Sequence, residues 1–203
     1  SVAIAPVRAA NAQVAVAAGN GAHWVVWDEE RDGDGSDLFA RKLEAAGPAA
    51  TEIRLTDFLG ASVKTRVTAQ QVAMAGSSLE LVMRVERDVA RPIMFVHVGE
   101  PNVALKEGLG DPVPGHKADR AAGSMRALTP AKERGDAPSI ACATDACLVA
   151  WHGEKVGTST GGGFAGFIDA KTGQLLWSKK FVTQGGKPSV GMGPKGEAAI
   201  AWF

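Results

Sequence analysis

Tyrosine is absent from this chain of 203 residues, whose aromatic side chains are seven phenylalanines and five tryptophans. Recognition surfaces of the antibody type depend on tyrosine, so a paratope-like surface is not expected. An excess of charge is also missing, because 22 Lys and Arg balance 22 Asp and Glu. A general binder of nucleic acid or of anionic membranes needs an excess of basic residues, and the balance argues against both.

Long apolar runs are missing as well. No stretch approaches the roughly 18 residues that a membrane-spanning helix requires, so no membrane span is predicted. Residues 1–6 lack the charged start and the apolar centre of an intact signal peptide. A mature end left by processing and an arbitrary chain boundary both stay open for this segment.

Cysteine is scarce, since the chain has only Cys142 and Cys147, which flank a short turn. If the two residues face each other across an antiparallel hairpin, their Cβ atoms come to about 4.5–5.5 Å, near the reach of a disulfide. We therefore predict a Cys142–Cys147 disulfide and an oxidising compartment, with two reduced, buried thiols as the alternative. The four histidines show no ligand spacing relative to the cysteines, so a metal site of Cys and His is not expected.

The chain does contain one hairpin phrase in four copies. Each copy is a short apolar strand, a turn rich in turn-forming residues, and a second strand that is nearly continuous in apolar residues. Aligned on one apolar residue of the first strand, the copies match at Val14, Val72, Ile140 and Val190, in steps of 58, 68 and 50 residues. Strand repeats with a period of about 40–50 residues are typical of propeller blades. We therefore predict an all-β fold, a β-propeller of short antiparallel blades.

The repeat divides the chain into four units of a single propeller domain, or of part of one. The predicted units are 12–58, 68–98, 138–182 and 186–203, with an insertion over 99–137. The last unit ends after its second strand, and the open strand edge that this leaves is a hazard for aggregation. Two closures are open. Residues 2–5 supply a strand that closes a four-bladed ring, or further blades of a larger ring lie on another chain or outside these residues.

Tryptophan recurs at one place in the phrase. Trp27, Trp151 and Trp202 end the second strand of three copies, and the second copy has Arg84 there. A large apolar side chain at a fixed position of a repeat favours packing between neighbouring blades over a ligand platform.

Two sets of residues carry a resemblance to known proteins. Residues 37–47 (DLFARKLEAAG), 148–151 (LVAW) and 164–170 (FAGFIDA) resemble secreted bacterial β-propeller repeat proteins. Residues 169–177 (DAKTGQLLW) resemble the quinoprotein-type, PQQ-like repeat, in which an Asp, a Thr-Gly turn and a Trp dock adjacent blades. The resemblance implies the propeller fold and a structural role for Trp177. It implies no cofactor, because the motif also occurs in non-catalytic scaffolds that bind no quinone.

An acidic loop is the candidate metal site. Residues 28–37 carry six carboxylates around two glycines. Ca²⁺ is bound by about six to eight oxygens, which closely spaced carboxylates at a Gly turn provide. The predicted ligands are Glu30, Asp32, Asp34 and Asp37, although Leu38 occupies the position at which a closing acid is expected. A solvated acidic hairpin loop is the alternative interpretation.

No group of residues forms a catalytic constellation, so no catalytic residue is predicted. We expect a non-catalytic, extracytoplasmic β-propeller (secreted, at the cell surface or periplasmic) that acts as a binding or assembly scaffold. Its partner would be a protein, a glycan or another chain of the same assembly. Two alternatives stay open: a fragment of a propeller enzyme, either a quinoprotein-like oxidoreductase or a hydrolase, and a calcium-assisted lectin-like module. Calcium is the one cofactor considered.

The calcium hypothesis predicts a change in thermal stability. Millimolar Ca²⁺ should raise the Tm of the protein, because a ligand that binds only the folded state stabilises it. Replacing Asp32 and Asp34 together by Ala should abolish this rise. Calorimetric scans with Ca²⁺, and with Mg²⁺ as the control ion, measure the effect. A Tm that does not respond to Ca²⁺ would refute the site.

Overall fold

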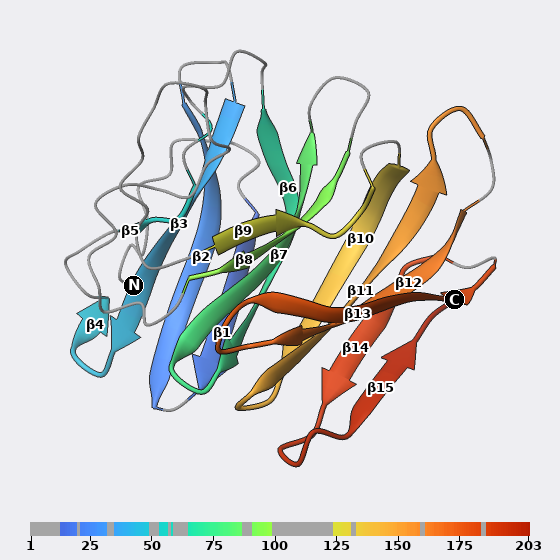
Figure 1. The fold of residues 1–203 in the computed structure, drawn as a ribbon. Coiled ribbons are helices and arrows are strands. Elements are labelled where there is room, and N and C mark those ends of the chain that lie inside the picture. The colour runs from blue at the N-terminus through green and yellow to red at the C-terminus, as the bar shows by residue number, and fades with distance from the viewer. Residues whose placement is uncertain are drawn as a thin grey trace.

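The computed structural model of the chain is built from β-strands. It describes residues 13–19, 21–31, 35–48, 53–56, 58, 65–86, 91–98, 124–130, 133–158, 161–183 and 186–203. Within these ranges there is no helix, and so none that could cross a membrane. The predicted all-β fold is confirmed. The strands form four antiparallel sheets that follow one another along the chain and lie side by side in that order (Figure 1).

Sheets 1 and 2 contain the hairpins of the first two predicted units. Sheet 1 has the strand order β1-β2-β3-β4, and β5 also pairs with β3. Its strands are β1 (Val14–Gly19), β2 (Ala22–Arg31), β3 (Gly35–Glu44), β4 (Gly47–Pro48) and β5 (Ile53–Arg54). Sheet 2 has the order β6-β7-β8-β9, with strands β6 (Arg66–Ala75), β7 (Ser78–Glu86), β8 (Ile93–His97) and β9 (Ser124–Ala127).

Sheets 3 and 4 contain the hairpins of the last two units. Sheet 3 has the order β10-β11-β12-β13, with strands β10 (Glu133–Cys142), β11 (Ala146–Lys155), β12 (Gly161–Asp169) and β13 (Gln174–Val182). Sheet 4 is two-stranded and consists of β14 (Ser189–Met192) and β15 (Ala198–Ala201). Every sheet therefore begins with the hairpin that the repeat predicts.

The predicted insertion over 99–137 differs from the structure at its C-terminal end. Residues 124–127 form β9, the fourth strand of sheet 2, and sheet 3 begins with β10 at Glu133. The long step between the second and third repeats arises because sheet 2 reaches its fourth strand through a long connection. Residues 99–123 lie outside the described residues, as do residues 2–5, which were predicted to supply a closing strand.

The strand register corrects the alignment of the repeats. Counted from the hairpin turns, the equivalent pairs are Val16–Val25, Val72–Leu81, Ile140–Val149 and Val190–Ile200. The first copy is therefore anchored on Val16 rather than on Val14. Two residues beyond each pair lie Trp27, Met83, Trp151 and Trp202. Met83, and not Arg84 as the sequence phrase suggested, occupies the tryptophan position of sheet 2.

The first strand of every sheet carries small side chains on one face. We call the aligned residue of each first strand (Val16, Val72, Ile140 or Val190) the anchor. The positions one and three residues after the anchor always hold Ala or Gly: Ala17 and Gly19, Ala73 and Ala75, Ala141 and Ala143, Gly191 and Gly193. Alternate residues of a strand share a face, so these positions lie together, and in sheets 1 to 3 they lie on the side of the next sheet. The opposite face carries larger apolar residues in sheets 2 to 4, namely Val72 and Met74, Ile140 and Cys142, and Val190 and Met192.

An apolar core fills each junction between consecutive sheets. Between sheets 1 and 2, the core contains Ala17, Trp24, Val26, Leu79, Leu81 and Met83. Between sheets 2 and 3, it contains Ala75, Val82, Phe95, Ile140, Val149 and Trp151. Between sheets 3 and 4, it contains Leu148, Ala150 and Ala165, against which Val190, Met192 and Ile200 pack. The small residues allow the first strands to approach closely, so that β6 contacts both β1 and β10, and β10 contacts β14.

Gly19 tests whether the first strands need small residues. A Cβ atom at Gly19 would lie 2.6 Å from the Cβ of Met74 in sheet 2, whereas a Cβ at Gly191 would meet nothing within 4 Å. Gly19→Ala should lower the free energy of unfolding by about 1–3 kcal/mol through overpacking. Gly191→Ala, the matched control, should change it by no more than about 0.5 kcal/mol. Urea denaturation measures both variants, and equal effects at the two positions would contradict this packing.

Candidate functional site

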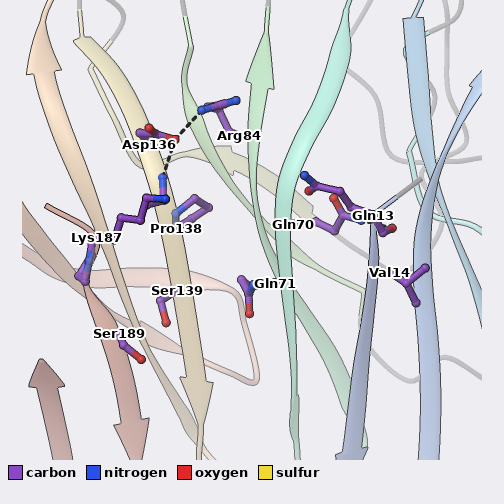
Figure 2. Close-up of a pocket in the computed structure, with 12 residues that line it drawn as sticks. Gln13, Val14, Gln70, Gln71, Arg84, Asp136, Pro138, Ser139, Lys187 and Ser189 are labelled. Atoms are coloured by element: carbon purple, nitrogen blue, oxygen red, sulfur yellow. Dashed lines mark hydrogen bonds and ion pairs between the residues drawn. The ribbon is translucent and has the colours of Figure 1, made fainter. Parts of the chain in front are cut away.

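A groove of about 790 Å³ lies along the first strands of the four sheets, at the start of β1 and β14 and at the middle of β6 and β10 (Figure 2). All four sheets line it, through residues 13–14, 70–71, 136–139 and 187–189, together with Arg84 of β7. Amides, hydroxyls and charged groups predominate among these side chains, in contrast to the apolar junctions between the sheets. A smaller pocket of about 390 Å³ lies at the opposite end of the same strands, against the hairpin turns.

One position of the repeat supplies a row of polar side chains to the groove. The residue directly before the anchor is Gln71 in sheet 2, Ser139 in sheet 3 and Ser189 in sheet 4. Ser139 Oγ accepts a hydrogen bond of 3.2 Å from the backbone N–H of Val190, which joins sheets 3 and 4 at the groove. Gln71 and Ser189 are exposed, so a ligand can reach their amide and hydroxyl groups.

Two β-bulges shape the groove. The register between β6 and β7 shifts between Thr68 and Gln71, and the register between β10 and β11 shifts between Asp136 and Ser139. Both bulges come directly before the polar row. A bulge turns a residue out of the strand ladder, and bulges are frequent beside functional sites. These two place Gln70 and Pro138 in the wall of the groove.

The second bulge contains a strained residue. Ala137 has a φ of 47°, and no other non-glycine residue in the described ranges has a positive φ. This conformation costs on the order of 1–3 kcal/mol for a residue with a Cβ atom. The Asp136 carboxylate stabilises it by accepting a hydrogen bond of 2.8 Å from the Ala137 N–H. Strain of this kind is concentrated at binding and catalytic sites.

An ion pair joins sheets 2 and 3 at the groove. Arg84 Nη1 lies 2.5 Å from Asp136 Oδ1 (Figure 2). The same guanidinium donates through Nε to Thr68 Oγ1 at 2.9 Å, and its Nη2 lies 3.0 Å from Glu86. Arg84 is therefore held by three acceptors and lines the groove, at a position that the sequence had assigned to packing between blades.

Gln70 is the most deeply buried polar side chain of the groove lining, with 3% of its surface exposed. Its Nε2 donates a hydrogen bond of 2.6 Å to the carbonyl oxygen of Gln13, which joins sheets 1 and 2. Its Oε1 is buried and has no hydrogen-bond partner within the described part of the chain. A buried acceptor without a hydrogen bond costs about 1–3 kcal/mol of free energy. A ligand that donates a hydrogen bond to Gln70 Oε1 would therefore remove this cost.

Only one of the four predicted calcium ligands has a described side chain. That residue, Asp37 in β3, is completely buried. Its carboxylate accepts hydrogen bonds from Arg54 Nη2 at 2.7 Å, Thr56 Oγ1 at 2.9 Å and the Phe58 N–H at 2.8 Å. Asp37 therefore holds Arg54, Thr56 and Phe58 against β3. The side chains of Glu30, Asp32 and Asp34 lie outside the described residues, and calcium binding there stays a prediction.

No group of three or more His, Cys, Asp or Glu side chains could hold a metal ion in the ranges that the structure describes. The predicted Cys142–Cys147 disulfide is present and joins the last residue pair before the turn between β10 and β11. The disulfide joins the two strands of the hairpin covalently beside the turn, at the end of the strands that is farther from the groove.

The four tryptophans singled out in the sequence fall into two groups. Trp27 and Trp151 are buried and stack on Phe39 and Phe164, with ring centroids 6.1 and 5.9 Å apart. Trp177 and Trp202 are 42% and 50% exposed. Trp177 stacks on Phe167 of the neighbouring strand at 5.9 Å.

The Asp-to-Trp motif of residues 169–177 forms a tight turn between β12 and β13. The Asp169 carboxylate accepts hydrogen bonds from the N–H groups of Thr172 and Lys171, at 3.0 and 2.9 Å. These bonds, that from Thr172 above all, lower the pKa of Asp169. Gly173 completes the turn with a φ of 66°, a conformation that glycine adopts without strain.

The groove was not predicted from the sequence, although the repeat contains a signal for it. A polar residue precedes the anchor in three of the four copies, and a proline precedes that residue in Pro138 and Pro188. The bulges that orient these residues depend on how two strands pair, which the residue pattern of a single strand does not reveal.

Comparison of the chain with protein-family models, with curated proteins and with solved structures found no match in any of the three. The proposals below therefore rest on the residues and their geometry.

A buried acid and a histidine form a second polar site, away from the groove. Glu80 of β7 is completely buried, and its Oε1 lies 2.8 Å from Nδ1 of His97, its partner residue on β8. Burial raises the pKa of Glu80 to about 6, although His97 opposes the shift. The pKa of His97 is raised as well, chiefly by its hydrogen bond to Glu80, and Asp169 of sheet 3 adds to this effect.

This pair predicts that stability falls as the pH rises. Both groups bind protons more tightly in the folded state than in the unfolded state. Their protonation therefore stabilises the folded state most below the ordinary pKa of Glu, 4.5. This stabilisation is lost as the pH rises past about 6 and then past the raised pKa of His97. The loss for Glu80 is on the order of 2 kcal/mol, or about 4–8 °C in Tm. Glu80→Gln should flatten the dependence of Tm on pH between 5 and 8. The exposed Glu44→Gln serves as control, and equal slopes for both variants would contradict this assignment.

Proposed function

We propose that the chain is part of an extracytoplasmic β-propeller that acts as a binding or assembly scaffold and not as an enzyme. Three features support the propeller arrangement. The sheets follow one another in chain order, the first strands of consecutive sheets contact each other, and an apolar core fills each junction. The blades of a propeller are likewise antiparallel sheets that pack face to face, with their first strands innermost.

The groove along the first strands carries the proposal. In a propeller, this position corresponds to the central channel, around which the first strands of the blades are arranged. Two bulges, one strained residue and one buried, unpaired amide oxygen coincide there, around Gln70 and Ala137. Strands with a purely structural role need none of these features.

The chemistry of the lining indicates the class of ligand. Gln70, Gln71 and Ser189 provide neutral donors and acceptors, Lys187 provides a cation, and Arg84 is neutralised by its acidic partners. Such a surface suits hydroxyl or amide groups, as in a glycan or an extended protein segment. The disulfide within the third hairpin supports the extracytoplasmic location, because disulfides persist in oxidising compartments.

Loss of binding in a groove variant tests this function. The purified protein is applied to a glycan array and to an array of extended peptides, and each hit is measured by calorimetry. Replacing Gln71, Ser139 and Lys187 together by Ala should weaken each hit at least about tenfold, the equivalent of 1.4 kcal/mol. A matched control replaces one Gln, one Ser and one Lys elsewhere, at Gln174, Ser178 and Lys195, and should bind like the parent.

Three results would contradict the proposal. Hits that survive the groove variant would place the binding surface elsewhere, and an absence of hits on both arrays would remove the support for a glycan or peptide ligand. A chromophore bound to the purified protein would favour the quinoprotein-like oxidoreductase instead.

A further inference from the structure

The smaller pocket, of about 390 Å³, lies beside the hairpin turns at the end of the strands away from the groove. Its walls include Met74 and Gly76 of sheet 2 and Cys142 and Thr144 of sheet 3. None of the side chains that line it carries a charge. Sheets 2 and 3 are neighbours in the middle of the chain and share an apolar core, which fixes this wall of the pocket.

The disulfide at this pocket is accessible from one side. Cys142 is partly exposed and lines the pocket, whereas Cys147 is completely buried. Cys147 belongs to the apolar core between sheets 2 and 3, together with Val82 and Val149. Exchange with a thiol requires direct attack on one of the two sulfur atoms, so access decides which cysteine is attacked. A molecule that enters the pocket therefore reaches Cys142 and not Cys147.

The two cysteines occupy a residue pair that has no backbone hydrogen bonds of its own. The Ala143 N–H donates to the carbonyl oxygen of Ala146 at 2.8 Å, so the hydrogen-bonded pair at this turn is Ala143–Ala146. Bonded and non-bonded pairs alternate along an antiparallel ladder, which makes Cys142–Cys147 a non-bonded pair. Opening the disulfide therefore breaks no backbone hydrogen bond. Free cysteine packs as a small apolar residue, so Cys147 can stay in the core when the bond is open.

We propose that Cys142 is a modification site, at which a small thiol such as glutathione forms a mixed disulfide. The thiolate attacks Cys142 Sγ from the pocket, the Cys142–Cys147 bond breaks, and a new S–S bond joins the small thiol to Cys142. Cys147 leaves as a thiolate and takes up the proton that the attacking thiol has lost, so that no charge stays in the apolar core. The net reaction adds one thiol molecule to the protein and needs no other oxidant or reductant.

The shape of the pocket favours a small thiol over a cysteine on the surface of another protein. The turns of sheets 2 and 3 lie close together, since a Cβ atom at Gly76 would lie 3.6 Å from the carbonyl oxygen of Thr144. The volume of the pocket falls in the range of small-molecule sites, roughly 300–1,000 Å³. The adduct should be long-lived, because Cys147 must become a thiolate within the core before it can expel the bound thiol.

Mass spectrometry of the native protein in millimolar glutathione tests the modification. The reaction is stopped with acid at successive times, and peptide maps at acid pH locate the adduct. Cys142 should carry at least about ten times as much glutathione as Cys147, because exchange follows access to the sulfur atom. In urea, where both cysteines are exposed, this preference should disappear. Equal amounts on the two cysteines of the native protein would overturn the proposal.

A bulky residue in the wall of the pocket tests the route of attack. Thr144 is exposed and lines the pocket, so Thr144→Trp should cover Cys142 and slow the addition of glutathione at least about tenfold. The matched control Thr158→Trp makes the same change on the exposed turn after β11 and should react like the parent. Equal Tm values show that both variants fold, and equal rates in urea show that their disulfides are intact. A Thr144→Trp variant that reacts as fast as the parent would overturn the proposal.

Alkylation of the reduced protein is an independent measurement. After both cysteines have been reduced and the reductant removed, iodoacetamide should modify Cys142 at least about ten times as fast as Cys147 in the native state. Equal rates would contradict the difference in access. A disulfide that reacts with glutathione in urea and not in the native protein would also overturn the proposal. The groove variant described above should react with glutathione like the parent, so a failed ligand site and a failed modification site are separate results.

Discussion

The close approach of the four first strands is the constraint on which the rest of the structure depends. The first strands of sheets 1 to 3 present Ala or Gly to the next sheet and receive larger residues from it, as in the contact of Gly19 with Met74. A larger residue on the small face would force neighbouring first strands apart. Burial of the junctions then provides most of the stability, since apolar area removed from water contributes about 25 cal/mol per Å². The sequence repeats because the same packing contact is made at three junctions between sheets.

The same convergence creates the groove. On the side of the anchor away from the hairpin turns, the apolar alternation of the first strands gives way to Gln71, Ser139 and Ser189, and the strands no longer need to pack without gaps. Polar groups from separate sheets are then joined by specific bonds, such as the ion pair between Arg84 and Asp136 and the hydrogen bond between Gln70 and Gln13. The apolar junctions set the distance between the sheets, and these polar contacts set the shape of the groove. A rigid frame of this kind allows strained residues such as Ala137 to persist.

The local pairing of strands could be predicted from the sequence, and the relations between sheets could not. The four hairpins and the disulfide follow from short apolar runs, turn residues and two cysteines at either side of a turn. The placement of Arg84 was wrong because a shift of one residue moves a side chain to the other face of a strand, and only the register reveals it. β9 was not predicted because Ser124–Ala127 lacks the repeat pattern. These residues form a strand through antiparallel pairing with β8. The bulges around Gln70 and Ala137, and the burial of Asp37 by Arg54 and Thr56, depend on partners distant in sequence.

The long connection between β8 and β9 has a consequence for the order in which the protein is assembled during synthesis. Sheet 1 is complete when residue 54 has emerged, but sheet 2 lacks its fourth strand until residue 127 is made. Synthesis proceeds at about 5–20 residues per second, so β8 stays an open edge for seconds. The segment that ends this interval also takes part in the junction with sheet 3, because Leu128 belongs to the apolar core between sheets 2 and 3, and Gly135 of β10 donates a backbone hydrogen bond to Arg91. Completion of the second sheet and docking of the third are therefore coupled events, and the nascent chain passes through a stage in which sheet 1 and three strands of sheet 2 have formed beside one unfinished edge.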